Sequence, residues 1–113
     1  MALLGMEYSD LATVKTYSSN TSTTSYNIKI YREGKLRILI GTVDKIPSGT
    51  DIALDAVDAP ELNGSQYGIT SYFFDTTSSS ARLININGSS GIHFWNAVAN
   101  TAYINICYFA KEI

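Results

Sequence analysis

The sequence predicts an all-β fold, and three observations support this prediction. Apolar and polar residues alternate with the two-residue period of half-buried strands, and no window sustains the 3.6-residue period of a helix. β-Branched and aromatic residues dominate the apolar runs. Candidate strands recur at intervals of about ten residues, a spacing typical of sandwiches and barrels.

The clearest element is a β-hairpin within residues 26–50. Its apolar positions alternate before and after a charged turn, at Tyr26, Ile28 and Ile30 and then at Leu36, Ile38 and Ile40. Gly34 provides the positive φ that a tight reversal requires. Pro47 is expected at the second position of a type I turn and Gly49 at its last position. The second strand is therefore expected to end near residue 43 or 44.

The remaining strands follow from the same alternation. They are expected at residues 12–17, 51–55, 66–75, 82–87, 92–95 and 102–110. A polar loop is expected at 18–25 and an irregular connection at 56–65. Together these elements predict about eight strands in a single β-sandwich domain spanning 1–113, with 1–11 as a disordered or added lead-in.

Composition limits the class of partner. Only 16% of the residues are charged, against roughly 25% in an average soluble protein, so clusters of Ser, Thr and Asn must provide the polar surface. Such surfaces are typical of extracellular and virion β-proteins. A net charge of −2 with scattered basic residues argues against a nucleic-acid partner. No apolar run approaches the ~20 residues of a membrane span, so no membrane partner is expected.

Catalytic and metal-binding motifs are weak. His93 is the single histidine and no serine lies in a G-x-S-x-G pattern, which argues against a nucleophilic triad. One histidine and one cysteine cannot form a multi-histidine zinc site, and no cofactor is expected. Asp55, Asp58 and Glu61 form an acidic cluster that could serve a glycosidase or bind calcium. A solvated loop is the favoured interpretation of this cluster.

Residues 92–95 suggest a binding function instead. Alternation places Ile92 and Phe94 on one face and His93 with Trp95 on the other. If the first pair is in the core, the second faces outward or towards another subunit. Sugars bind to such surfaces, because the apolar face of a pyranose stacks on an aromatic ring while polar side chains bind the hydroxyls. Packing in a core or interface is the alternative for Trp95, and it is the commoner environment of tryptophan.

Several strands carry apolar residues on both faces, which suggests that a second copy covers one of them. Leu39 and Val43 lie opposite Ile38 and Ile40, and the last strand has the same two-faced character. The expected interface residues are Leu39, Val43, Tyr103 and Phe109. Burial beneath loops is the alternative.

The order of four short motifs resembles a known family. The motifs are GKLRILIGTV at 34–43, IPSGT at 46–50, INING at 84–88 and YINICY at 103–108. Together they resemble the C-terminal head domains of bacteriophage tail-fibre and baseplate receptor-binding proteins. The resemblance covers residues 13–109, and each motif is short.

The resemblance implies a jelly-roll-like antiparallel β-sandwich that assembles as a homotrimer in a phage tail or baseplate. It implies recognition of bacterial cell-surface carbohydrate and contact with other tail or baseplate proteins, without enzymatic activity. Receptor sites vary within this family, so no binding residue is transferred from it. The residues expected to contact sugar are Trp95, His93, Tyr67 and Asp58. A purely structural virion protein is the alternative, and a small glycoside hydrolase is less favoured.

Overall fold

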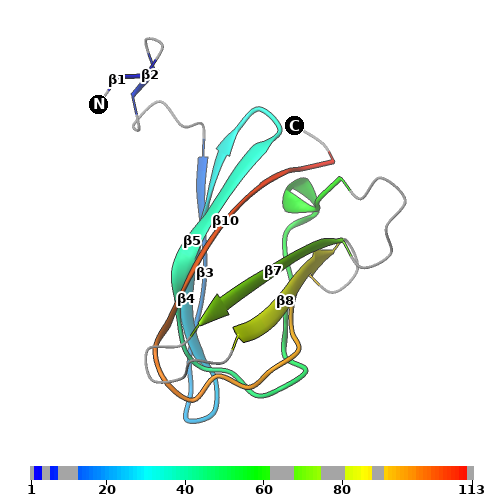
Figure 1. Ribbon diagram of the computed structural model, residues 1–113. Coiled ribbons are helices and arrows are strands. Elements are labelled where there is room, and N and C mark those ends of the chain that lie inside the picture. Colours follow the sequence, from blue (N-terminus) through cyan, green and yellow to red (C-terminus); the bar gives the residue numbers. More distant parts are fainter. Residues whose placement is uncertain are drawn as a thin grey trace.

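The protein is a β-sandwich of two four-stranded antiparallel sheets, seen from the edge in Figure 1. The structure is a computed structural model that describes residues 2–3, 6–7, 13–61, 68–74, 81–87 and 91–111. The predicted all-β fold is confirmed as two packed antiparallel sheets.

Each sheet contains three consecutive strands that pair in order and a fourth strand that pairs at one end of this group. The first sheet has the order β10 (Ala102–Phe109), β5 (Leu36–Lys45), β4 (Ser25–Glu33), β3 (Thr13–Asn20). The second has the order β6 (Asp51–Ile52), β9 (Gly91–Phe94), β8 (Ala81–Asn87), β7 (Ile69–Phe74). Near the N-terminus, β1 (Ala2–Leu3) pairs with β2 (Met6–Glu7) in a separate two-stranded sheet. The second sheet therefore follows a Greek-key order, with β6 beside β9, whereas β10 extends the β3–β4–β5 meander of the first sheet.

Local sequence correctly predicted the tight turn at Gly34, but it placed the next turn one residue too early. Gly34 has a φ of 56°, as the tight reversal between β4 and β5 requires. Pro47 occupies the first rather than the second position of its turn, because the Thr50 amide donates to the Pro47 carbonyl at 3.2 Å. Gly49 is then third, with a φ of 82°. The expected loop at 18–25 is shorter than predicted, since β3 continues to Asn20.

The inward face of β5 differs from the expectation. Leu39 and Val43 are fully buried inside this chain, so they are core residues and the prediction that they form a subunit interface is wrong. Leu39 pairs with Ile30, and cross-strand partners lie on the same face of a sheet. The register thus places Leu39 inward with Ile30, and Ile40 becomes 38% exposed on the outer face.

The core lies between the two sheets. Its large apolar members include Ile28, Ile30, Leu39, Ile104, Ile106 and Tyr108 from the first sheet and Ile52, Phe73, Ile84, Ile86, Ile92 and Phe94 from the second. Phe73 and Phe94 pack edge to face, with ring centroids 6.1 Å apart. Ile92 and Phe94 are both 0% exposed, which confirms that this pair faces the core.

The helical structure of the described residues is limited to one 3-10 turn, Ala56–Asp58, drawn in green beside the end of β10 in Figure 1. It lies in the stretch that was expected to be irregular. No helix in the described part of the chain is long and apolar enough to cross a membrane.

Candidate functional site

Exposed aromatic side chains gather on the outside of the second sheet. Tyr72, Phe74 and Trp95 are 65%, 57% and 47% exposed. They share this side with a polar row that crosses all four strands, in which cross-strand pairing joins Thr70, Asn85, His93 and Asp51. We call this surface, with its three aromatic and four polar residues, the outer aromatic face.

Three hydrogen bonds hold Trp95, two through its backbone and one through its ring. Its amide donates to the Leu83 carbonyl at 3.1 Å, and the Ser48 hydroxyl donates to its carbonyl at 3.0 Å. Its indole N–H donates to Oδ1 of Asn85. The Trp95 ring is therefore an exposed aromatic surface whose position is already set, which lowers the entropy lost when a ligand packs on it.

The polar row forms two hydrogen-bonded pairs next to that ring. The Asn85 amide nitrogen donates to Oγ1 of Thr70 at 2.7 Å, and Asn85 is only 6% exposed. Nδ1 of His93 lies 2.5 Å from Oδ1 of Asp51, and the His93 ring meets the Trp95 ring edge to face at 4.5 Å. Polar hydrogen-bonding groups thus lie next to a flat apolar surface, the combination that binds sugars.

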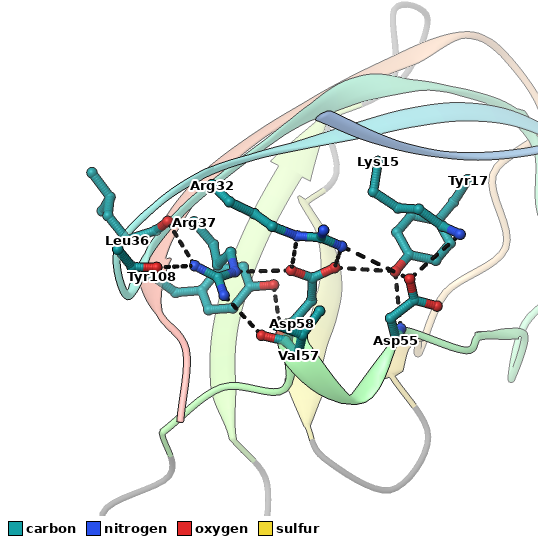
Figure 2. Close-up of polar contacts among 10 residues, drawn as sticks. Lys15, Tyr17, Arg32, Leu36, Arg37, Asp55, Val57, Asp58 and Tyr108 are labelled. Atoms are coloured by element: carbon teal, nitrogen blue, oxygen red, sulfur yellow. Dashed lines mark hydrogen bonds and ion pairs between the residues drawn. The ribbon is translucent and has the colours of Figure 1, made fainter. Parts of the chain in front are cut away.

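Asp58, a predicted sugar contact, is placed elsewhere and is fully buried. Figure 2 shows two arginines reaching its carboxylate from the first sheet. Arg32 donates from Nε to Oδ1 at 2.8 Å and from Nη2 to Oδ2 at 2.7 Å. Arg37 donates from Nε to Oδ1 at 2.8 Å, and the Tyr17 hydroxyl donates to Oδ2 at 3.2 Å. Asp58 therefore cannot contact a ligand at the surface, and the prediction that it contacts sugar is wrong.

Further contacts show that this network fastens the 3-10 turn to the first sheet. Nη2 of Arg37 donates to the Val57 carbonyl at 2.9 Å, and the Tyr108 hydroxyl donates to the Asp58 carbonyl at 2.8 Å. Arg37 is 1% exposed, and its guanidinium also donates to the carbonyls of Gly34 and Leu36, so its charge is balanced by the Asp58 carboxylate and by backbone carbonyls. We interpret the network as the structural closure of one end of the sandwich.

The three carboxylates of the acidic cluster differ in exposure, although Nη2 of Arg32 lies within ion-pair distance of both Asp55 and Asp58. Asp55 is half exposed and lies 3.4 Å from Nζ of Lys15, whereas Asp58 faces inward and Glu61 is exposed. Burial alone would raise the pKa of Asp58, but hydrogen bonds and charge from Arg32, together with Arg37 and Tyr17, hold it below its ordinary value. A glycosidase acid needs a raised pKa, so Asp58 is unsuited to that role. Within the described residues, no group of three or more His, Cys, Asp or Glu side chains is arranged to hold a metal ion.

We expect stability to fall at both extremes of pH. The lowered pKa of Asp58 means that its contribution is present above the ordinary value of 3.8 and is lost as pH falls through the folded-state pKa. Burial, with the nearby charges of Asp58 and Asp55, raises the pKa of Tyr17 from 10.0 to about 12. Its contribution is therefore present below pH 10 and is lost as pH rises towards 12. Urea unfolding across the pH range measures both effects.

Two variants serve as controls for this pH dependence. Tyr17→Phe should reduce the loss of stability at alkaline pH, because it removes one phenol that the fold keeps neutral. Asp55→Asn should leave the loss at acid pH largely intact, since Asp55 is half exposed. If the loss of stability at acid pH disappeared in Asp55→Asn, Asp58 could not be the group that causes it.

The structure brings together two of the predicted sugar-contact residues and places further residues beside them. Trp95 and His93 lie together facing outward, whereas Tyr67 lies outside the described residues. Sequence reasoning missed Tyr72 and Asn85 as parts of the surface. For Asn85 a signal existed, since its place between Ile84 and Ile86 puts it on the polar face of its strand. Tyr72 lies in a strand with aromatic residues on both faces, so alternation could not assign its direction.

Comparison with known proteins does not assign the chain to a family. No protein-family model matches the chain, and no curated protein matches it. The outer aromatic face is therefore interpreted from its geometry and chemistry.

Proposed function

We propose that the protein is a receptor-binding head of a phage tail or baseplate that recognises bacterial surface carbohydrate without enzymatic activity. The observation that carries the proposal is the outer aromatic face, where the fixed, 47% exposed Trp95 ring lies over the hydrogen-bonded Asn85 and beside His93. The order of sequence motifs supplies the phage context. Presentation of several heads together would multiply a weak affinity for each sugar.

The chemistry of the face is suited to a sugar ring. The C–H face of a pyranose would stack on Trp95, and its hydroxyls would pair with groups of the polar row. Thr70 accepts a hydrogen bond from Asn85 and retains its own O–H as a donor, while the exposed Asp51 carboxylate is an acceptor. Tyr72, 65% exposed two residues beyond Thr70, extends the aromatic surface.

Trp95→Ala is the direct test of this proposal. We expect it to weaken binding about 10- to 100-fold, since loss of a central aromatic anchor typically costs more than 1 kcal/mol. An array of bacterial surface polysaccharides is the probe, followed by titration with soluble fragments of any that bind. Trp95 is the single tryptophan of the chain, so its fluorescence reports on ligand binding in the unaltered protein.

Phe109→Ala is the matched control. Phe109 is an aromatic residue that is 63% exposed on the first sheet, away from the outer aromatic face. Its replacement should leave affinity for a soluble fragment unchanged, because monovalent binding does not depend on assembly. Equal binding by the Trp95→Ala variant would reject the proposed site. A protein that binds no polysaccharide but assembles with tail proteins would favour the purely structural function.

A further inference from the structure

The outside of the first sheet is a second, separate apolar surface. Its most exposed apolar residues are Tyr103 at 66%, Phe109 at 63%, Val14 at 49% and Ile40 at 38%. They come from β3, β5 and β10, so they extend across the whole sheet. Extended apolar patches of this kind are uncommon on monomeric proteins and usually mark an interaction surface. We call this surface the first-sheet outer face.

The area of the first-sheet outer face approaches that of a standard protein interface. Four strands spaced about 4.8 Å apart and eight residues long at about 3.3 Å per residue cover a flat area on the order of 500 Å². Because side chains make the accessible surface larger than this flat area, the face approaches the ~800 Å² that each partner buries in a stable complex. A second copy of the same sheet would cover it completely.

The charges on the first-sheet outer face are complementary to themselves. Lys29 and Glu33 lie on β4 at equal distances before and after Tyr31, and all three share the outward side of the strand. The outward positions of the neighbouring β5 between Leu36 and Thr42 are uncharged. A two-fold axis that crosses the strands at Tyr31 therefore places Lys29 opposite Glu33 of a second copy, and Glu33 opposite Lys29.

The other face-to-face arrangement is unfavourable. A two-fold axis parallel to the strands would place β4 over β5 of the second copy. Lys29 and Glu33 would then face Ile40 and Leu36, because these are their cross-strand partners in the sheet. That arrangement would bury two charges without partners, at a substantial cost in free energy.

We propose that two copies of this chain associate through their first-sheet outer faces, about a two-fold axis that crosses the strands at Tyr31. The row through the axis contains Tyr31, Ile38 and Cys107, which are joined by cross-strand pairing. Because Cys107 is in this row and its side chain is exposed, the two-fold axis places it opposite Cys107 of the second copy. The outer aromatic faces remain on the two outer sides of the pair. The pairing is independent of carbohydrate binding, and it replaces the trimer implied by the sequence resemblance.

Charge reversal tests the pairing. Lys29→Glu and Glu33→Lys should each raise the dissociation constant of the dimer at least tenfold, because each places like charges opposite one another. The double variant should restore it to within about threefold of the unaltered protein. Lys45→Glu, at the end of β5, is the matched control and should leave the dissociation constant unchanged. Sedimentation equilibrium of the full chain measures all four variants.

Cys107 provides a second measurement that does not depend on the charge variants. A short bis-maleimide should link two copies through this single cysteine, and Lys29→Glu should lower the yield of covalent dimer at a protein concentration near the dissociation constant of the unaltered protein. A protein that remains monomeric up to about 1 mM, where even weak pairs form, would overturn the proposal. A trimer, or a dimer whose dissociation constant is unaffected by charge reversal, would also overturn it.

Discussion

Replacement of Asp58 by asparagine is expected to lower the free energy of unfolding by about 3 to 5 kcal/mol, the usual cost of breaking a buried ion pair by removing one partner. The amide preserves the shape of the side chain but removes the negative charge that Arg32 and Arg37 share. Arg32 is 17% exposed and can recover some hydration, whereas Arg37 is 1% exposed and cannot. An uncompensated guanidinium inside the sandwich is the physical cause of the loss.

Asp55→Asn is the control for this variant. Asp55 is 47% exposed and lies 3.4 Å from Lys15, so its replacement should cost no more than about 1 kcal/mol. A domain of this size has about 5 to 15 kcal/mol of stability, so both variants should remain measurable by urea titration. Equal losses in the two variants would show that the Asp58 network does not close the sandwich as described.

Leu39→Ala is expected to lower the free energy of unfolding by about 2 to 5 kcal/mol, the range for a buried leucine reduced to alanine. Leu39 is 0% exposed between the two sheets, so the substitution leaves a cavity in the core of one chain. The loss should therefore be independent of protein concentration. Chemical unfolding measured at two protein concentrations tests this directly.

Ile40→Ala is a matched control from the same strand. Ile40 is 38% exposed on the first-sheet outer face, so its replacement should change the stability of the single chain by less than about 1 kcal/mol. Its effect should appear in dimer formation instead. If Leu39→Ala changed the free energy of unfolding little but weakened association strongly, Leu39 would belong to a subunit interface and not to the core.

The strand pattern could be predicted because it is a local property. Residues 82–87 and 92–95 alternate clearly, and the structure has strands at Ala81–Asn87 and Gly91–Phe94. The same alternation correctly separated Ile92 and Phe94 from His93 and Trp95. It failed for β5, where Leu39 and Ile40 are both apolar, because alternation shows which residues share a face without showing which face is buried.

The candidate site could be predicted only in part, since most of it depends on contacts distant in sequence. Trp95 and His93 are two residues apart, and their shared direction follows from strand geometry. Asp51 joins His93 only through the pairing of β6 with β9. Asp58 appeared in the sequence as one carboxylate of a loop, and nothing nearby indicated that Arg32 and Arg37 would enclose it.

The amino-acid sequence by itself determined the all-β class, most strand positions and the shared face of Trp95 and His93, because alternation and turn residues act over a few neighbouring positions. Only the tertiary structure decided that Leu39 is in the core, that Asp58 is a buried structural anion, and that Thr70, Asn85, His93 and Asp51 form one row. Each of these depends on which strands pair and in which register. A shift of one residue in that register would turn every side chain of a strand to the opposite face.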